Sequence, residues 1–344
     1  MADRKKKKIY ICLVLFVVFC GILYINIQNK QRKGNLLKKL RDWQVKEGIG
    51  VYLIYGREVD GILGECKGHT LLLNKELYIM KGRYSSYRKL FIVEADDGAG
   101  KVGLYGINLN GKIIWKYEDI ELLGSFWGEI SSDGKKFLFF GKDKISKEEK
   151  ILILNMENGD VFQVPFDGKF PMWCGNEKIV YVATMKSDGL GLVELYDLKT
   201  GDVRKLGYGN MVSGAPDGNY VTYRDMDLNF CIIDIRSREK KHLFSGKDIL
   251  TPLVWSPNSK YLLYVKNVKG IFSELFSNLV RMDFFGMCKM IHRFKTLGME
   301  PKDVMIYCIS DGFSVKVGEV YKSMPLDFVF VRDKILYKKV CIGF

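Results

Sequence analysis

Histidines and the sequence motifs of familiar enzymes are scarce in this chain. The three histidines, His69, His242 and His292, do not have the spacing of a metal-binding motif, and no Gly-x-Ser-x-Gly elbow of an α/β-hydrolase occurs. Residues 98–101, Gly-Ala-Gly-Lys, resemble the end of a phosphate loop, but Val102 stands where that loop needs a hydroxyl. The sequence therefore predicts no catalytic residue, no bound metal and no cofactor.

Cysteine pairs with ligand spacing are also missing. None of the eight cysteines forms a Cys-x-x-Cys pair, which makes a zinc site unexpected from the sequence. Two cysteines fall in the apolar run described below. The other six are even in number, so the sequence permits disulfide bonds among them. Cys231 lies within an apolar stretch and is interpreted as a small buried hydrophobic residue.

Alanine is scarce and sustained helical periodicity is absent beyond Val51, whereas the chain contains 19 tyrosines and 21 phenylalanines. Aromatic and β-branched residues favour strands. A hydrophobic fraction of 47% in 344 residues is enough for a substantial core. We therefore expect an all-β domain.

The net charge of +14 is concentrated at one end of the chain. Residues 1–41 contain eleven lysines and arginines and one aspartate, so the remainder carries little excess charge of either sign. A mixed domain of this kind lacks the basic footprint of a nucleic-acid-binding protein. We expect no nucleic-acid partner.

An uncharged run of 19 residues, 9–27, follows a basic tail at residues 1–8. Its length matches what a helix needs to cross a bilayer, and it exceeds the apolar core of a cleaved signal peptide. Lipidation at Cys20 is the alternative, but Phe19 stands where a lipoprotein signal needs a small residue. The run is predicted to be an uncleaved, single-pass membrane anchor.

Basic residues flank this run on both sides, five before it and six after it. The denser cluster precedes it, which favours a cytoplasmic N-terminus and an extracytoplasmic domain. Residues 28–47 are expected to be a basic amphipathic stalk, with a short helix over 35–47 in which apolar residues recur at helical spacing: Leu36, Leu37, Leu40 and Trp43. That helix either lies on the lipid headgroups or acts as a plain stalk.

A repeat of about 42 residues begins after the stalk. Asp133, Gly175, Asp217 and Asn258 occupy equivalent positions, 42, 42 and 41 residues apart, each before a short apolar strand. Asp133-Gly134 and Asp217-Gly218 supply the positive-φ residues of tight hairpins. A second element with Asn-Gly or Thr-Gly turns keeps the same step. One period therefore contains four strands, which is typical of a propeller blade.

Two of these segments carry a family resemblance. Ala215-Pro-Asp-Gly-Asn-Tyr-Val-Thr-Tyr223 and Trp255-Ser-Pro-Asn-Ser-Lys-Tyr-Leu-Leu-Tyr264 resemble the blade motif of TolB-like, WD-repeat-like β-propellers. The resemblance implies a bacterial source and six blades. Asn110-Gly-Lys-Ile-Ile-Trp115 separately resembles a repeat of quinone-cofactor propellers.

The spacing of the repeat predicts seven units, and the first of them could instead complete the last to close the ring. The all-β domain is therefore expected to be a propeller of six or seven four-stranded blades spanning residues 48–344. The units predicted from the spacing are 50–83, 84–124, 125–166, 167–208, 209–249, 250–297 and 298–344.

Loops after the second strand of each blade are expected to gather on one face, which is the default binding surface. Residues 225–229 copy the start of a calcium loop, but Phe230 replaces its glycine and Arg236 its closing glutamate, so a polar hairpin is expected. An apolar stripe in the 266–278 loop is expected to pack on the propeller's own rim, with a lid or a partner site as the alternatives. The candidate binding residues are Lys142, Asp143, Lys186, Asp188, Asp225, Asp227, Asn229, Phe272 and Phe276.

These observations lead to one functional hypothesis and one alternative. The hypothesis is a membrane-anchored, extracytoplasmic, non-enzymatic binding or scaffold module for a protein or an envelope polymer. The alternative is a propeller enzyme acting at the central funnel, either a carboxylate-based hydrolase or lyase or a quinone-dependent dehydrogenase. The sequence contains no pattern that identifies its ligand or its oligomeric state.

Overall fold

A computed structural model describes most of the chain downstream of residue 27. The described residues are 28–40, 42, 46, 49–55, 58–61, 70–85, 87–117, 120–121, 128–143, 148–185, 190–249, 251–267, 302–320 and 328–332. The chain divides into two compact units, Met1–Lys46 and Glu47–Phe344.

The N-terminal unit contains a described helix over residues 28–40. Leu36 and Leu40, one turn apart, are buried, whereas Leu37 is 42% exposed. The helix predicted over 35–47 is thus found in part, and its described part extends back to residue 28. The predicted tail 1–8 and membrane helix 9–27 lie outside the described residues. Among the helices that are described, none combines the length and apolar character required for a membrane span.

The described strands of the second unit are antiparallel and form five sheets. Their orders are β24-β1-β2-β3, β4-β5-β6-β7, β12-β11-β10 with β8 and β9 both paired to β10, β13 to β19 in sequence, and β20-β21-β22-β23. The strand bounds in the first half of the unit are β1 Ile49–Tyr55, β2 Glu58–Gly61, β3 Thr70–Leu72, β4 Tyr78–Ser85, β5 Leu90–Asp96, β6 Val102–Asn108, β7 Ile113–Tyr117, β8 Ile120–Glu121, β9 Glu129–Ile130, β10 Lys136–Asp143, β11 Glu149–Asn155 and β12 Val161–Gln163. In the second half they are β13 Lys169–Cys174, β14 Lys178–Met185, β15 Gly191–Asp197, β16 Val203–Gly214, β17 Tyr220–Asp225, β18 Asn229–Asp234, β19 Lys240–Ser245, β20 Val254–Trp255, β21 Tyr261–Asn267, β22 Lys302–Cys308, β23 Phe313–Val320 and β24 Phe328–Arg332.

The seven-stranded sheet is two four-stranded groups that share one strand. β16 is 12 residues long, pairs with β15 through its first part and with β17 through its last part. Gly209 marks the crossing, because it is the register partner of both Gly191 and Asp225. A Cβ atom at Gly209 would lie 2.2 Å from the carbonyl oxygen of Arg224, so the crossing requires a glycine. The described strands thus form six groups, of which five have four strands and one, β8 to β12, has five.

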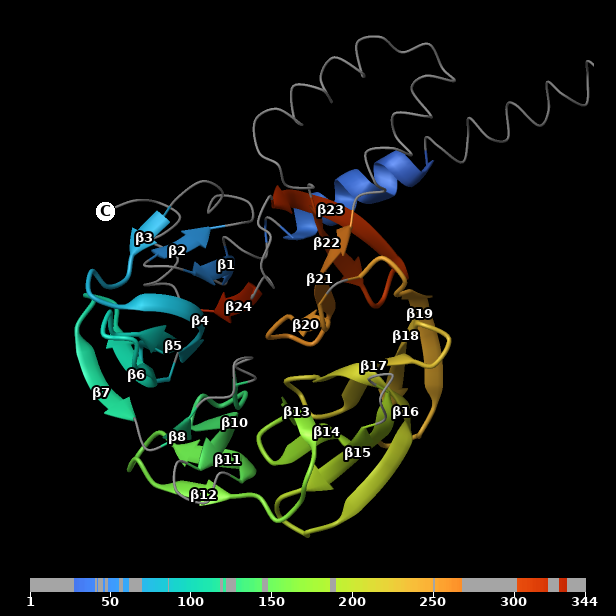
Figure 1. Ribbon diagram of the computed structural model, residues 1–344. Helices are drawn as coiled ribbons and strands as arrows, with labels where there is room; N and C mark the ends of the chain where they lie inside the picture. Colours follow the sequence, from blue (N-terminus) through green and yellow to red (C-terminus); the bar gives the residue numbers. More distant parts are fainter. Residues whose placement is uncertain are drawn as a thin grey trace, which may run out of the picture. The chain divides into compact units, whose positions relative to one another are not determined.

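Successive groups contact one another around a closed circuit (Figure 1). Contacts join β1 to β4, β4 to β9, β9 to β13, β13 to β16, β16 to β20 and β20 to β24. The circuit closes because β24, from the end of the unit, pairs with β1, from its beginning. This arrangement is consistent with a TolB-like propeller.

The division into seven units is wrong at both ends of the repeat. β1, β2 and β3, from the predicted unit 50–83, share a sheet with β24. β22 and β23, from the predicted unit 298–344, complete the sheet of β20 and β21. Residues 268–301 separate β21 from β22, and this long connection shifts the phase on which the count of seven rested.

The hydrophobic core lies between the groups, as the alternation along β18 shows. Cys231 and Ile233 belong to a cluster shared with the neighbouring group of β13 to β16. Phe230 and Ile232 belong to a second cluster, shared with β20 to β22. Both faces of this strand are therefore buried, as expected for blades stacked face to face.

The turns that carry the repeat motif have the predicted geometry. Gly134 and Gly218 have φ angles of 75° and 73°, and each turn closes with an N–H that donates to the carbonyl three residues earlier. The later hairpins follow the same rule, with Gly159 and Gly201 at φ 82° and 76°. The predicted role of these glycines in hairpin turns is confirmed.

Candidate functional site

The first turns of successive groups meet one another at one end of the strands. The Asp133 N–H donates to Oδ1 of Asn176 (2.8 Å), and the Asp217 N–H donates to Oγ of Ser259 (3.2 Å). Ser132 Oγ donates to the Pro216 carbonyl at 2.6 Å, although a whole group of strands separates these two turns along the chain. The turns therefore converge, and they are joined by hydrogen bonds at this end of the strands.

The predicted binding loops leave the opposite ends of the same second strands. Each connects a second strand to a third strand: β10 to β11, β14 to β15, β17 to β18 and β21 to β22. The side chains of Lys142 and Asp143 at the end of β10, and the whole of Lys186, Asp188, Phe272 and Phe276, lie outside the described residues. Asp225, Asp227 and Asn229, in the β17–β18 hairpin, are described.

One carboxylate oxygen of Asp225 organises the β17–β18 hairpin. Oδ1 accepts hydrogen bonds from the N–H groups of Asp227 (3.1 Å) and Asn229 (3.0 Å). The predicted polar hairpin is therefore found. Asp and Asn side chains favour such turns because they accept hydrogen bonds from backbone N–H groups a few residues ahead. This turn brings Asp225, Asp227 and Asn229 close together.

The second carboxylate oxygen of Asp225 faces three side chains from the neighbouring strands. Oδ2 lies 3.2 Å from Cys231 Sγ, 3.4 Å from Lys240 Nζ and 3.9 Å from His242 Nδ1. Cys231 Sγ is itself 3.4 Å from His242 Nδ1. We call Asp225, Cys231, Lys240 and His242 the Asp225 cluster.

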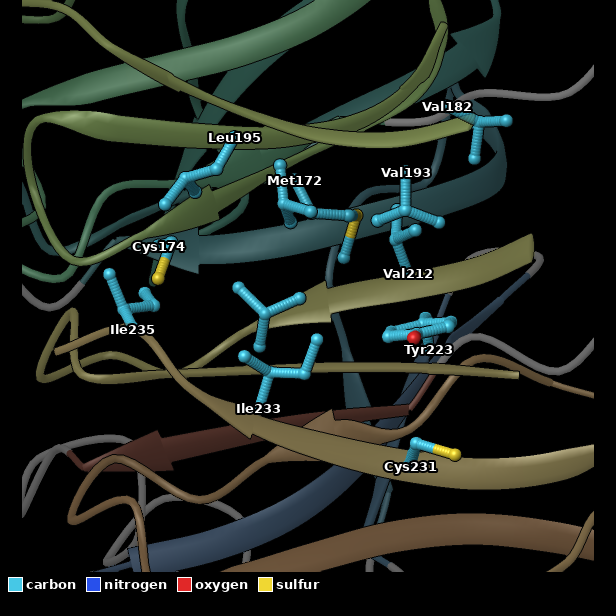
Figure 2. Close-up of a cluster of buried hydrophobic side chains, with 12 residues drawn as sticks. Met172, Cys174, Val182, Val193, Leu195, Val212, Tyr223, Cys231, Ile233 and Ile235 are labelled. Atoms are coloured by element: carbon cyan, nitrogen blue, oxygen red, sulfur yellow. The ribbon is translucent and has the colours of Figure 1, made fainter. Parts of the chain in front are cut away.

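Strand register brings the cluster together. Tyr223 on β17 is the partner of Cys231 on β18, which is the partner of His242 on β19. Partners on adjacent strands project from the same face of a sheet. In Figure 2, Tyr223 and Cys231 lie at one end of the buried cluster, and Cys174 and Ile235 lie at the other end.

Burial of the cluster decreases from the strands outward. Cys231 is fully buried, and the Asp225 side chain is 9% exposed. The side chains of Lys240 and His242 are 38% and 62% exposed. The exposed side chains of the cluster therefore both lie on β19, whereas the carboxylate and the thiol are buried.

The environment shifts the pKa values of Asp225 and Cys231 in opposite directions. Burial opposes the charge of Asp225, but hydrogen bonds from the Asn229 N–H and the Cys231 thiol, together with the Lys240 ammonium, outweigh it and lower the pKa of this carboxyl. Burial, followed by the hydrogen bond to Asp225, raises the pKa of the Cys231 thiol to about 12. At neutral pH the thiol is therefore protonated and donates a hydrogen bond to an ionised carboxylate.

Large apolar side chains lie exposed beside the cluster. Met226 and Leu228, at the tip of the β17–β18 hairpin, are 63% and 36% exposed. Tyr208 on β16 is 54% exposed and precedes Gly209, the register partner of Asp225. The hairpin thus presents apolar and acidic groups together.

Two solved structures resemble this ring of sheets. The fold is similar to that of TolB. TolB from Acinetobacter baumannii superposes with a TM-score of 0.55 at 13% identity, over 84% of this chain and 69% of that chain. A putative TolB from Agrobacterium tumefaciens gives a TM-score of 0.50 at 10% identity, over 79% and 89% respectively. No family model and no curated protein matches the sequence.

These comparisons establish the resemblance to TolB-like propellers at the level of the fold. At identities this low they carry no residue of a TolB site onto this chain.

Sequence reasoning selected Asp225 but missed its partners on β18 and β19. Cys231 and His242 are 11 residues apart, which matches no local ligand motif. The signal was available in the β18–β19 hairpin, whose turn around Asp234 fixes Cys231 opposite His242. Cys231 and His242 are neighbours because of the register between β18 and β19, and not because of their spacing in the sequence.

Proposed function

We propose that this chain is a membrane-anchored, extracytoplasmic binding or scaffold module without catalytic activity. Its TolB-like ring binds a protein or an envelope polymer through the end of the strands that carries the β17–β18 hairpin. The observation that carries this proposal is the exposure of Met226 and Leu228 at the tip of that hairpin, next to the carboxylates of Asp225 and Asp227.

Exposed apolar groups of this size are costly in water and typical of an interface centre. Methionine and tyrosine are enriched at protein interfaces, and polar groups usually form their rim. Here Met226 and Tyr208 are the exposed methionine and tyrosine, and Asp227 is the polar group beside them. The opposite end of the strands has its turns hydrogen-bonded to one another, which supports placing the partner at the hairpin end.

The anchor in this proposal is the uncharged run 9–27. Its length suits a membrane span, and the basic tail before it favours a cytoplasmic N-terminus. Alkaline extraction of membranes from cells making the full chain tests this part. The chain should stay in the membrane pellet, and a variant lacking residues 1–27 should be released. Release of the full chain under the same conditions would contradict an anchor.

Binding is tested by photo-crosslinking in cells that make the full chain. A photoreactive residue replaces Met226 in one variant and Ile114 on β7 in the matched control, where the native side chain is 52% exposed. We expect a discrete adduct from position 226 and none from position 114. A protein partner gives an adduct in which mass spectrometry identifies peptides of a second protein, whereas an envelope polymer gives an adduct whose size falls on glycan-degrading treatment.

Two results would contradict the binding face. One is equal adduct formation from positions 226 and 114, which would indicate nonspecific contact. The other is an adduct that depends on the basic segment 28–47 and not on the hairpin. Circular dichroism of each variant verifies that the ring has folded.

A further inference from the structure

The Asp225 cluster brings together three potential metal ligands from three consecutive strands. Asp225 Oδ2 comes from β17, Cys231 Sγ from β18 and His242 Nδ1 from β19. All three atoms lie within 4.8 Å of one another. We propose that this group binds a Zn²⁺ ion.

The distances between the three atoms fit a zinc ion without rearrangement of the strands. The separations are 3.2 Å from oxygen to sulfur, 3.4 Å from sulfur to nitrogen and 3.9 Å from nitrogen to oxygen. A point about 2.0 Å from all three atoms lies in their plane, and moving slightly out of the plane reaches the ~2.0 to 2.3 Å of zinc bonds to nitrogen, oxygen and sulfur. Tetrahedral zinc ligands are separated by roughly 3.3 to 3.6 Å, so the observed triangle brackets that range.

The two oxygens of Asp225 have separate tasks, which leaves one of them for a ligand. Oδ1 is engaged by the N–H groups of Asp227 and Asn229, and these bonds fix the carboxylate. Asp197 and Asp234 use Oδ1 in the same way in their own turns. At Asp225, by contrast, Oδ2 faces a thiol and an imidazole, so the turn pre-orients a ligand as well as closing a hairpin.

Binding replaces a proton and balances charge. The Cys231 thiol, which donates to Asp225 in the absence of metal, releases its proton to solvent and coordinates as a thiolate. Two negative ligands and one neutral imidazole then surround a doubly positive ion. Thiolate and imidazole together favour Zn²⁺ over Mg²⁺ or Ca²⁺, which prefer oxygen ligands. A water molecule completes the fourth position.

Lys240 is the group that opposes the ion. Its ammonium lies 3.4 Å from Asp225 Oδ2, and the same Nζ lies 5.2 Å from the centre of the Tyr223 ring. Its side chain is 38% exposed, so it can turn toward solvent when the ion enters. Removing its charge should therefore tighten metal binding, an effect that a purely structural cluster would not produce.

The test uses the purified full chain after treatment with a chelator, titrated with Zn²⁺ by calorimetry and with Co²⁺ by absorption. The native chain should bind one equivalent of Zn²⁺, and bound Co²⁺ should show the charge-transfer band of a thiolate ligand. H242A and C231A should each weaken binding at least about 100-fold, because loss of a first ligand removes a metal bond. K240A should tighten it by about tenfold, because repulsion between the ammonium and a divalent cation is removed.

K241A is the matched control, since Lys241 neighbours both variant positions on β19 and its side chain is 69% exposed. It should bind as the native chain does. Circular dichroism identifies a variant that fails to fold, and H242A, at an exposed position, keeps the test decisive if C231A unfolds. Native affinity in H242A, weaker binding in K240A, or a Co²⁺ spectrum without the thiolate band would overturn the proposal.

Discussion

Replacing Gly175 with alanine tests the convergence of the turns. Gly175 has a φ angle of 70°, a region that costs an L-residue roughly 1 to 2 kcal/mol. A Cβ atom there would also lie 3.1 Å from the Cα of Gly218, in the turn of the neighbouring group. That atom belongs to the backbone and cannot rotate away, so crowding should add about 1 to 2 kcal/mol. We expect G175A to lose about 2 to 4 kcal/mol of unfolding free energy.

G201A is the matched control for this prediction. Gly201 has a similar φ angle of 76°, but a Cβ atom there would meet nothing within 4 Å. It should therefore lose only the backbone term, about 1 to 2 kcal/mol. Urea unfolding followed by tryptophan fluorescence measures both, and Trp173, buried beside the Gly175 turn, is a suitable reporter. An equal loss in the two variants would refute the claim that the turns pack against one another.

Three further predictions use other sites. G218V should lose at least about 1 to 3 kcal/mol in urea unfolding, because a β-branched residue is strained at a φ angle of 73°. D225N should lose about 1 to 3 kcal/mol at pH 7 in chelator. Since the folded pKa of Asp225 is lowered, that contribution is present above the ordinary carboxyl pKa and lost as pH falls through the folded value, so native chain and variant should converge in acid. Burial raises the pKa of Cys174 to about 12, so between pH ~9 and 11 this thiol should remove about 1.4 kcal/mol of native stability per pH unit. In unfolding measured from pH 8 to 11, the stability of C174A should therefore fall less steeply than that of the native chain by this amount.

The local fold was predictable because turn chemistry and strand patterns repeat in the sequence. Asp217-Gly218 specifies a turn through the φ angle that its glycine adopts, and the alternating apolar residues of β18 specify two buried faces. Ring closure was harder to predict. The pairing of β1 with β24 joins residues from opposite ends of the unit, and no local pattern encodes a contact of that range.

The candidate site shows the same division. Asp225 and Asn229 could be selected because a polar hairpin is a local feature. Cys231 and His242 became partners only through the register of β18 and β19, which depends on where the intervening turn closes. A thiol inside an apolar strand gives no sequence sign of whether it faces another apolar group or a carboxylate.

The pairing of β24 with β1 also determines the order in which the chain can finish folding. During synthesis β1 emerges first, and its partner, residues 328–332, emerges only after the five other groups have been made. Until then one edge of β1 lacks a neighbour, and an unpaired edge is a site for aggregation or for pairing with a second chain. A premature stop codon upstream of residue 328 would make that transient state permanent, so such truncated chains should self-associate even though most of their strands are intact.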